Sequence, residues 1–263
     1  MTEKDNYQPG TPNWIDIGSP DPDATANFYS ALFGWQVDEA DPDPLYGGYR
    51  MANINGRPVA GIGAAQQQGV PWWTTYVSVQ DADTTAKAVA DSGGQVLVEP
   101  FDVATFGRMG VFADPTGAPF SIWQPIQHIG SAVVNEHGTL TWNELHTRDR
   151  ERAKEFYGKV FGWHFADIDM GNFVYTVARL TDAEDDRGLA GVMPMGENQG
   201  DRPDHWKVYF AVDDADAVAA KVSGLGGSVI MPPESMPGVG RMAGLTGPHG
   251  EEIMLIASEP AQS

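Results

Sequence analysis

The side chains best suited to chemistry occupy matching places in two stretches of the sequence. An aromatic residue is followed two positions later by a carboxylate in "WID" at 14–16, and again in "WNE" at 142–144. A carboxylate can act as a general acid or base, and an aromatic side chain beside it can form one wall of a pocket for a planar ligand. The two segments therefore direct attention to Asp16 and Glu144.

Composition excludes several other kinds of site. The 263 residues contain no cysteine, which rules out disulfides, thiolate metal sites and cysteine nucleophiles and fits a reducing cytoplasm. Lys and Arg total 16 against 36 Asp and Glu, and a net charge of −20 repels nucleic acid and anionic membranes. No apolar run is long enough to span a bilayer, and the first residues do not read as a signal peptide. We expect a cytoplasmic protein that binds neither nucleic acid nor membrane.

The elements that position these residues are duplicated. "FYSALFGW" at 28–35 returns as "FYGKVFGW" at 156–163, and the stretch 10–37 lies over 138–165 without a gap. Further on, 93–117 lies over 226–250 at an offset of 133. Two halves with one order of motifs indicate a duplicated domain. We place the domains at 1–132 and 133–263.

A strand and a helix open each half. The strands are expected over Trp14–Ile17 and Trp142–Leu145, and the octapeptide forms the end of the helix that follows each of them. The expected helix signals are the caps Asp21 or Asp23 and Asp149, the terminal glycines Gly34 and Gly162, and a buried face of Ala24, Phe28, Ala31 and Leu32 in the first helix. The repeated octapeptide is thus predicted to dock a helix end onto a sheet.

A hairpin and a second strand–helix unit complete each half. Asn55-Gly56 predicts a tight hairpin turn in the first half, whereas the charged segment 181–188 predicts a longer loop in the second. Around these turns Tyr175 and Gly191 match Tyr49 and Gly61. Helices over 82–92 and 215–224 then open the second unit of each half, and three short strands follow. The chain is predicted to be α+β, with four βαβββ modules.

This organisation, with "VDDAD" opening the last helix, "FY…FGW" closing the first helix of each half and "DPTG" turning into the last strand, resembles the vicinal oxygen chelate superfamily. Its members include glyoxalase I, extradiol dioxygenases, methylmalonyl-CoA epimerase and the bleomycin- and fosfomycin-resistance proteins. The likeness covers roughly 10–258, and is greatest to tandem two-domain glyoxalase-like proteins often labelled hydroxylases. It implies two glyoxalase-like domains whose curled, mixed β-sheets form cups.

In catalytic members of that family, each cup holds one divalent metal through His, Glu or Gln. The inherited ligand positions fall on Trp14, Thr74 and Ser121 in the first half and on Trp142, Lys207 and Met254 in the second. None of these is a standard metal ligand, because tryptophan and protonated lysine offer no lone pair. We therefore expect neither a metal nor another cofactor in the cups.

Alternation along strands extends the inherited positions to the whole inward face. The first cup is predicted to present Trp14, Asp16, Thr74, Tyr76, Ser121 and Trp123, and the second Trp142, Glu144, His146, His205, Lys207, Tyr209, Glu252 and Met254. Aromatic walls with a few polar groups fit a planar or semi-polar organic ligand. The second cup has the denser polar cluster, and we expect it to be the more specialised.

Several of these candidate residues also have a structural interpretation. Trp14 and Trp142 could be core residues, and Asp16 and Glu144 could bond only to nearby backbone. Glu144 and Lys207 could be a structural ion pair. Glu144, His146 and His205 could instead form a metal site displaced by two residues. The arginines of the repeated "GRM", Arg108 and Arg241, could reach a ligand, although salt bridges to acidic neighbours are favoured.

Three functions remain open. The first is a metal-independent small-molecule binding protein of the bleomycin-resistance type, as a monomer or homodimer. The second is an isomerase, lyase or oxygenase-type enzyme in which Glu144 acts as general acid or base with Lys207 as its electrostatic partner. The third is a metal-dependent glyoxalase or dioxygenase. The residues at the inherited ligand positions favour the first.

Overall fold

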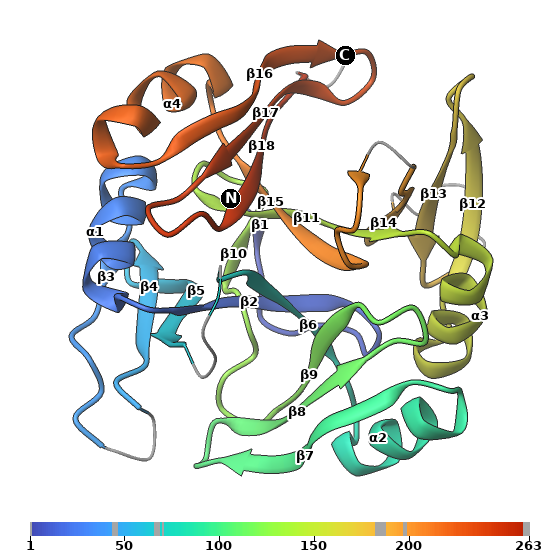
Figure 1. The fold of residues 1–263 in the computed structure, drawn as a ribbon. Helices are drawn as coiled ribbons and strands as arrows, with labels where there is room; N and C mark the ends of the chain where they lie inside the picture. The colour runs from blue at the N-terminus through green and yellow to red at the C-terminus, as the bar shows by residue number, and fades with distance from the viewer. Residues whose placement is uncertain are drawn as a thin grey trace.

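Two mixed eight-stranded sheets dominate the protein, one from each half (Figure 1). The computed structural model describes residues 2–43, 47–65, 69, 71–181, 188–196 and 199–259. The first sheet contains β2 (Pro12–Ser19), β3 (Gln36–Val37), β4 (Arg50–Ile54), β5 (Arg57–Ala64), β6 (Trp73–Ser78), β7 (Gln95–Val103), β8 (Gly107–Ala113) and β9 (Pro119–Pro125). The second contains β11 (Thr139–Thr147), β12 (His164–Asp169), β13 (Val174–Arg179), β14 (Ala190–Pro194), β15 (His205–Ala211), β16 (Ser228–Met236), β17 (Gly240–Thr246) and β18 (Glu252–Ser258).

The strand order shows how the four modules combine. It is β3-β4-β5-β2-β6-β9-β8-β7 in the first sheet and β12-β13-β14-β11-β15-β18-β17-β16 in the second. The opening strands of the two modules, β2 with β6 and β11 with β15, pair antiparallel at the centre of each sheet. Each sheet is therefore built from two modules adjacent in sequence, and the predicted α+β class with curled, open sheets is confirmed. A short pair, β1 (Thr2–Glu3) with β10 (Val133–Val134), joins the N-terminus to the connection between the sheets.

In the described residues four α-helices accompany the sheets: α1 (Pro22–Phe33), α2 (Ala82–Asp91), α3 (Arg150–Phe161) and α4 (Ala215–Val222), the last followed by the 3-10 turn η3 (Ser223–Leu225). Asp21, rather than Asp23, caps α1 by accepting from the amide of Ala24 at 3.0 Å, and Asp149 caps α3 in the same way. Gly34 and Gly162 end these helices with φ of 76° and 71°, so both predicted stops are confirmed. No helix in the described part of the chain is long and apolar enough to cross a membrane.

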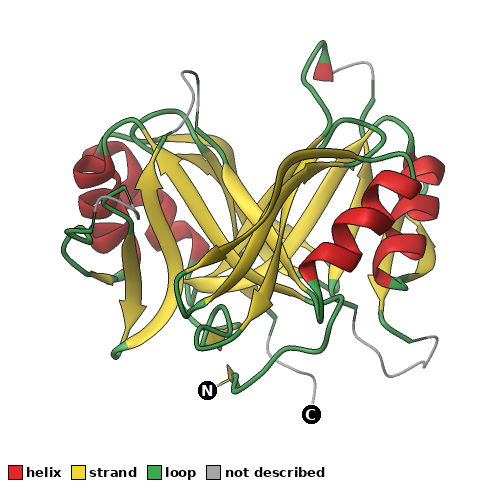
Figure 2. Cartoon of the chain, turned by 90° about the horizontal axis from the view of Figure 1, so that it is seen from below, coloured by secondary structure: helices red, strands yellow, loops and turns green. Residues whose placement is uncertain are grey.

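Each sheet comes from one half, but each hydrophobic core combines elements of both halves. One core packs α1 and strands of the first module against α4 and strands of the fourth, with Ile15, Leu32, Phe210 and Val218 among its members. The other packs the second module against the third, around α2 and α3. Figure 1 places α1 beside α4 and α2 beside α3, and Figure 2 shows the helices at opposite ends with the sheets between them. Both cores therefore depend on both halves.

Both octapeptides contact the opposite half of the protein. Tyr29 accepts a hydrogen bond from the Trp73 indole at 3.0 Å and donates to Glu251 of the other half at 3.3 Å. In the second copy Tyr157 accepts from Trp206 at 3.0 Å and donates to Asp114 at 2.9 Å. The closing tryptophans also cross over, because Trp35 donates to the carbonyl of Gly138 and Trp163 to that of Gly10, each at 2.7 Å. The helix end does dock onto a sheet as predicted, and in doing so it binds the partner half.

Smaller predictions have mixed outcomes. Asn55-Gly56 forms the expected turn with positive φ at both residues. The predicted buried face of α1 is wrong at Ala31, which is exposed, and at Ala24, which is half-buried. Tyr29 and Phe33 take their places because the contact with the other half rotates the buried face toward the larger rings. Of the loop expected at 181–188, residues 182–187 lie outside the described residues.

Candidate functional site

The floor of the first cup is a chain of hydrogen bonds that ends on Asp16. The indole of Trp14 donates to the hydroxyl of Tyr49 at 3.1 Å, and Tyr49 donates to Oδ2 of Asp16 at 3.2 Å. Tyr76 donates to the same oxygen at 2.7 Å, and Thr74 is a further partner of this carboxyl. Strands β2, β5 and β6 position this cluster, since Asp16 lies level with Thr74 and Gly61 on its two neighbours.

Asp16 lies deep in the concave face but keeps some contact with solvent, being half-buried rather than buried. Burial raises the pKa of its carboxyl from 3.8 to about 6, against the lowering effect of hydrogen bonds from Tyr76, Tyr49 and Thr74. Neutral hydroxyl donors stabilise a carboxylate less than a cation does, and no ion pair to Asp16 forms among the described residues. This carboxyl can therefore change protonation state near neutral pH.

Apolar side chains surround that polar floor. Trp14, Tyr76 and Trp123 form one buried cluster, with Met51, Val103 and Met109 packed against it. Farther out, β7 and β8 carry Val98 opposite Val111 and Phe101 opposite Met109, and both Val98 and Phe101 are exposed. Ser121 lies level with Tyr76 and bonds to it. All six residues predicted for the first cup are thus brought onto one face.

The second cup repeats the chain around Glu144. The indole of Trp142 donates to Tyr175 at 2.9 Å, and Tyr175 donates to Oε2 of Glu144 at 2.8 Å. Tyr209 donates to Oε1 at 2.5 Å, and Nε2 of His146 lies 2.7 Å from the same oxygen. Met254 packs with Tyr209 and Trp142 on this face.

The environment of Glu144 differs from that of Asp16. Glu144 is only 4% exposed, and both of its carboxylate oxygens have partners within the protein. Burial raises its pKa, but the hydrogen bond and charge of His146, with the hydroxyls of Tyr209 and Tyr175, outweigh burial and hold the pKa below its usual value. Glu144 is therefore a buried, ionised group whose two oxygens are already hydrogen-bonded.

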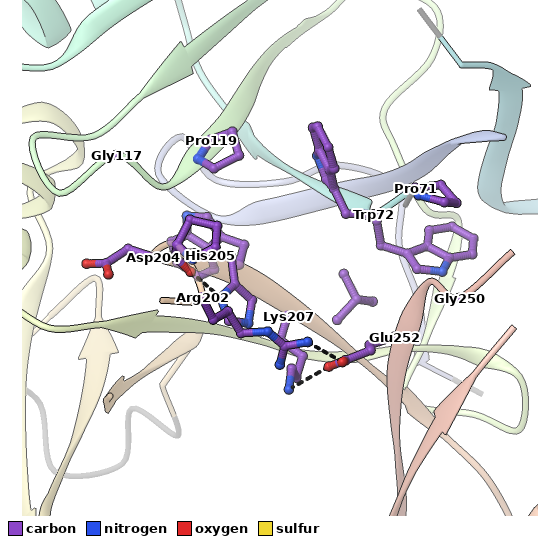
Figure 3. A pocket seen from close by; sticks show the side chains of 14 residues that line it. Pro71, Trp72, Gly117, Pro119, Arg202, Asp204, His205, Lys207, Gly250 and Glu252 are labelled. Atoms are coloured by element: carbon purple, nitrogen blue, oxygen red, sulfur yellow. Dashed lines mark hydrogen bonds and ion pairs between the residues drawn. The ribbon is translucent and has the colours of Figure 1, made fainter. Parts of the chain in front are cut away.

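The remaining residues predicted for the second cup line a different pocket. The ion pair considered for Glu144 and Lys207 does not form: Lys207 pairs with Glu252, at 3.3 Å, and Arg202 pairs with the same carboxylate. His205, Lys207 and Glu252 line a pocket between the halves, together with Trp72 and other residues of the first half (Figure 3). The physical reason is the position of β15, which has Glu144 on one neighbouring strand and Glu252 on the other.

The residues present do not fit the family's metal. The indole nitrogens at two inherited ligand positions, in Trp14 and Trp142, are used as donors to tyrosines. The displaced site considered for Glu144, His146 and His205 does not form: the imidazoles stack at 5.0 Å instead of converging. Within the described ranges no group of three or more His, Asp or Glu side chains has the spacing to hold an ion.

Two residues of the candidate site were missed by sequence reasoning, namely Tyr49 and Tyr175. Each lies over a glycine of the neighbouring strand: a Cβ on Gly61 would stand 1.7 Å from the Tyr49 hydroxyl, and one on Gly191 would stand 1.9 Å from that of Tyr175. The repeated tyrosine–glycine match was visible in the sequence and was the signal available. The two "GRM" arginines, by contrast, form the expected salt bridges, Arg108 with Asp83 and Asp102 and Arg241 with Asp216.

Comparisons with known proteins agree with this architecture. The family described as glyoxalase/bleomycin resistance protein/dioxygenase superfamily matches residues 11–122, and a bleomycin resistance protein-like N-terminal family matches residues 139–177. The protein named "Putative glyoxylase CFP32" from Mycobacterium tuberculosis is 41% identical and covers 100% of both chains. The anthracycline biosynthesis protein DnrV of Streptomyces peucetius is 38% identical over 95% of this chain and 94% of its own.

Solved structures show the same fold at low identity. A Mn(II)-bound glyoxalase from Novosphingobium aromaticivorans superposes with a TM-score of 0.65 at 17% identity, covering 96% of this chain and 83% of that one. The 2,2',3-trihydroxybiphenyl 1,2-dioxygenase of Sphingomonas wittichii gives 0.66 at 14% identity, covering 94% and 90%. The full-length relatives are 38% and 41% identical to this chain, which therefore belongs to the glyoxalase/bleomycin resistance protein/dioxygenase superfamily, the vicinal oxygen chelate proteins.

Proposed function

We propose that the protein binds a small, planar, semi-polar organic molecule in its first cup without a metal ion. The observation that carries the proposal is the half-buried carboxyl of Asp16, held by Tyr76 and Tyr49 at the bottom of an apolar cup. A carboxyl that is fixed in place but still open to solvent can accept a hydrogen bond from a ligand hydroxyl. Glu144 is the weaker candidate, because its oxygens are already occupied.

The walls support a planar ligand. Trp14 and Trp123 form the sides of the floor, and Val98 and Phe101 expose apolar surface on the concave face above it. Exposed apolar side chains gathered in a concave surface mark a binding site more often than a free surface. A relative of similar length is named for anthracycline biosynthesis, and a polycyclic aromatic ligand would suit such walls.

A second candidate function rests on the protonation of Asp16. A carboxyl whose pKa is about 6 is half-ionised at about pH 6, so both of its protonation states are available close to the range in which a general acid or base works best. Asp16, rather than Glu144 with Lys207, is then the residue to transfer a proton, with Tyr76 as its hydrogen-bonding partner. The class of reaction would be an isomerisation or proton abstraction that needs no metal.

The test uses 1,4-dihydroxyanthraquinone, a planar aromatic with hydroxyl donors, titrated by tryptophan fluorescence. Binding to Asp16→Asn and Tyr76→Phe should weaken by about 1–3 kcal/mol, the cost of leaving a buried polar partner unpaired. Glu144→Gln is the matched control in the second cup and should keep the wild-type affinity. Equal loss in Asp16→Asn and Glu144→Gln, or no loss in either, would refute the assignment to the first cup.

Metal independence has its own measurement. Protein treated with a chelator and dialysed should bind the anthraquinone as tightly as untreated protein. Loss of binding on chelation and recovery on adding Mn²⁺, Fe²⁺ or Zn²⁺ would overturn this part of the proposal. For the proton-transfer candidate, the rate of any turnover should follow an apparent pKa near that of Asp16 and be lost in Asp16→Asn.

A further inference from the structure

A pocket of about 450 Å³ lies between the two halves, where β6 and β15 begin (Figure 3). Its lining contains residues that are equivalent in the repeat, at the same offset of 133 found in the sequence: Trp72 with His205, Gly117 with Gly250, and Pro119 with Glu252. The pocket is therefore placed where the two copies meet, and its size is within the range of small-molecule sites.

The two copies give this pocket unlike sides. The first half supplies Trp72, Pro71 and Pro119, which are apolar, whereas the second supplies Lys207, Glu252 and Arg202, which are charged. Figure 3 shows the apolar group facing the charged group across the pocket. A ligand that satisfies both sides must have an apolar surface on one edge and a polar group on the other.

Trp72 is the most unusual residue of the apolar side. It is 53% exposed, whereas Trp14, Trp35, Trp73, Trp123, Trp163 and Trp206 are each at most 5% exposed. A tryptophan ring exposed to this extent in the wall of a pocket offers a large, rigid face for stacking. The neighbouring prolines Pro71 and Pro119 add flat apolar surface to the same side.

On the charged side two cations share one carboxylate, so one positive charge is not neutralised. Glu252 is the shared partner of Lys207 and Arg202, and these two cations hold its pKa below the usual value in spite of burial. Asp204, nearby, does not supply the missing charge, because it accepts from Thr147 at 2.7 Å and pairs with Arg148 at 3.1 Å. The Lys207 side chain is only 12% exposed, and a cation so poorly hydrated gains from an additional anionic partner.

His205 offers a neutral hydrogen-bond acceptor on the same side. Its Nδ1 lies 2.9 Å from the carbonyl of Pro203, which can only accept, so Nδ1 carries the proton and Nε2 keeps its lone pair. Nε2 is buried and has no hydrogen-bond partner in the described part of the protein. Buried acceptors are seldom left unpaired, and a ligand hydroxyl that reached it would complete the site.

We propose that this pocket between the halves is a second ligand site, which takes a planar aromatic anion such as an aromatic carboxylate that also carries a hydroxyl group, the donor for Nε2 of His205. The ring lies against Trp72 and Pro119, and the anionic group lies on Lys207 and Arg202. The site is separate from the first cup, so binding at this pocket does not depend on the function proposed for Asp16.

The experiment is calorimetric titration with 2-naphthoate and with its neutral analogue 2-naphthamide. Trp72→Ala should weaken 2-naphthoate about tenfold, as expected for a central aromatic contact. Lys207→Met should also weaken 2-naphthoate about tenfold, by loss of a charge-assisted hydrogen bond, while 2-naphthamide stays within about twofold. Melting temperatures of both variants check that the fold is retained, since Glu252 keeps Arg202 as its partner.

The controls separate this site from the cup and from general charge effects. Lys87→Met removes the same charge from an exposed helix pair with Asp91 and should leave 2-naphthoate affinity unchanged. Asp16→Asn should also leave it unchanged. The proposal is overturned if 2-naphthoate does not bind saturably, if Trp72→Ala and Lys207→Met bind it like wild type, or if Asp16→Asn alone abolishes binding.

Discussion

The carboxyls at equivalent positions in the two cups should affect stability in opposite directions as pH changes. Asp16 has a pKa raised by burial, whereas hydrogen bonds and the charge of His146 hold the pKa of Glu144 below its usual value. Asp16→Asn and Glu144→Gln remove one titration each while preserving shape. Subtracting the free energy of unfolding of each variant from that of the wild type isolates the contribution of one carboxyl.

The sign follows from which state holds the proton more tightly. For Asp16 the folded state does so, and its contribution to stability is fully present below pH 3.8 and is lost as pH rises to about 6. At about 1.36 kcal/mol per pKa unit, the shift from 3.8 to about 6 amounts to at most about 3 kcal/mol, reduced by the remaining solvent contact. For Glu144 the folded state favours the ionised form, so its contribution is present above pH 4.5 and is lost as pH falls through the lowered pKa.

The assay is urea unfolding at intervals from pH 4 to pH 8, followed by tryptophan emission. The wild-type-minus-Asp16→Asn difference should fall by up to about 3 kcal/mol between pH 4 and pH 6.5 and then stay level. The wild-type-minus-Glu144→Gln difference should instead decline as pH falls from 4.5 toward 4. A flat Asp16→Asn difference, or a Glu144→Gln difference that grows as pH falls from 4.5 to 4, would refute the assignment of one raised and one lowered pKa.

Three other outcomes follow from the same structure. His146→Ala should make Glu144 resemble Asp16, so its Glu144→Gln difference curve should now fall as pH rises toward 7; a curve unchanged from that in the wild-type background would rule out His146 as the cause. Residues 1–132 expressed alone should fail to give a cooperative unfolding transition, because both cores contain residues of both halves. Coexpression with 133–263 should restore the transition. A half that unfolds cooperatively by itself would contradict the shared cores. Tyr157→Phe should lower the free energy of unfolding by about 1–3 kcal/mol, since it leaves Oδ2 of Asp114 and the Trp206 indole without a partner. Tyr29→Phe should cost less because the bond from Tyr29 to Glu251 is longer. Urea midpoints measure both, and equal or negligible losses would count against these contacts.

Local signals in the sequence account for the elements and their order. Asp21, Asp149, Gly34 and Gly162 bound two helices because caps and left-handed glycines act within a single turn of chain. Alternation on the strands likewise places Trp14, Asp16 and Thr74 on one face. The partner of each octapeptide was beyond such reasoning. An aromatic helix end indicates that the helix docks, but nothing local distinguishes its own half from the other.

The candidate site was predicted in part for the same reason. Lys207 lies level with Glu144 on β11 and, through the parallel pairing of β15 with β18, level with Glu252 on the other side. Sequence alternation allows both partners. The choice is made by Tyr175, Tyr209 and His146, which occupy the oxygens of Glu144 and leave Glu252 to the lysine. The sequence predicted Tyr209 on this face, but Tyr175 comes from β13, and its contact with Glu144 could be known only from the fold.

A single position explains why the two cups differ although their hydrogen-bond chains are alike. The residue two places after the carboxylate is Gly18 in the first half and His146 in the second. Tryptophan and two tyrosines are common to both floors, so these neutral donors cannot set the pKa values of Asp16 and Glu144 apart. His146 brings a charge-assisted hydrogen bond to Glu144 and leaves it ionised and closed, whereas Gly18 brings no side chain and leaves Asp16 with neutral donors alone. This one difference accounts for the opposite shifts in the pKa values of Asp16 and Glu144.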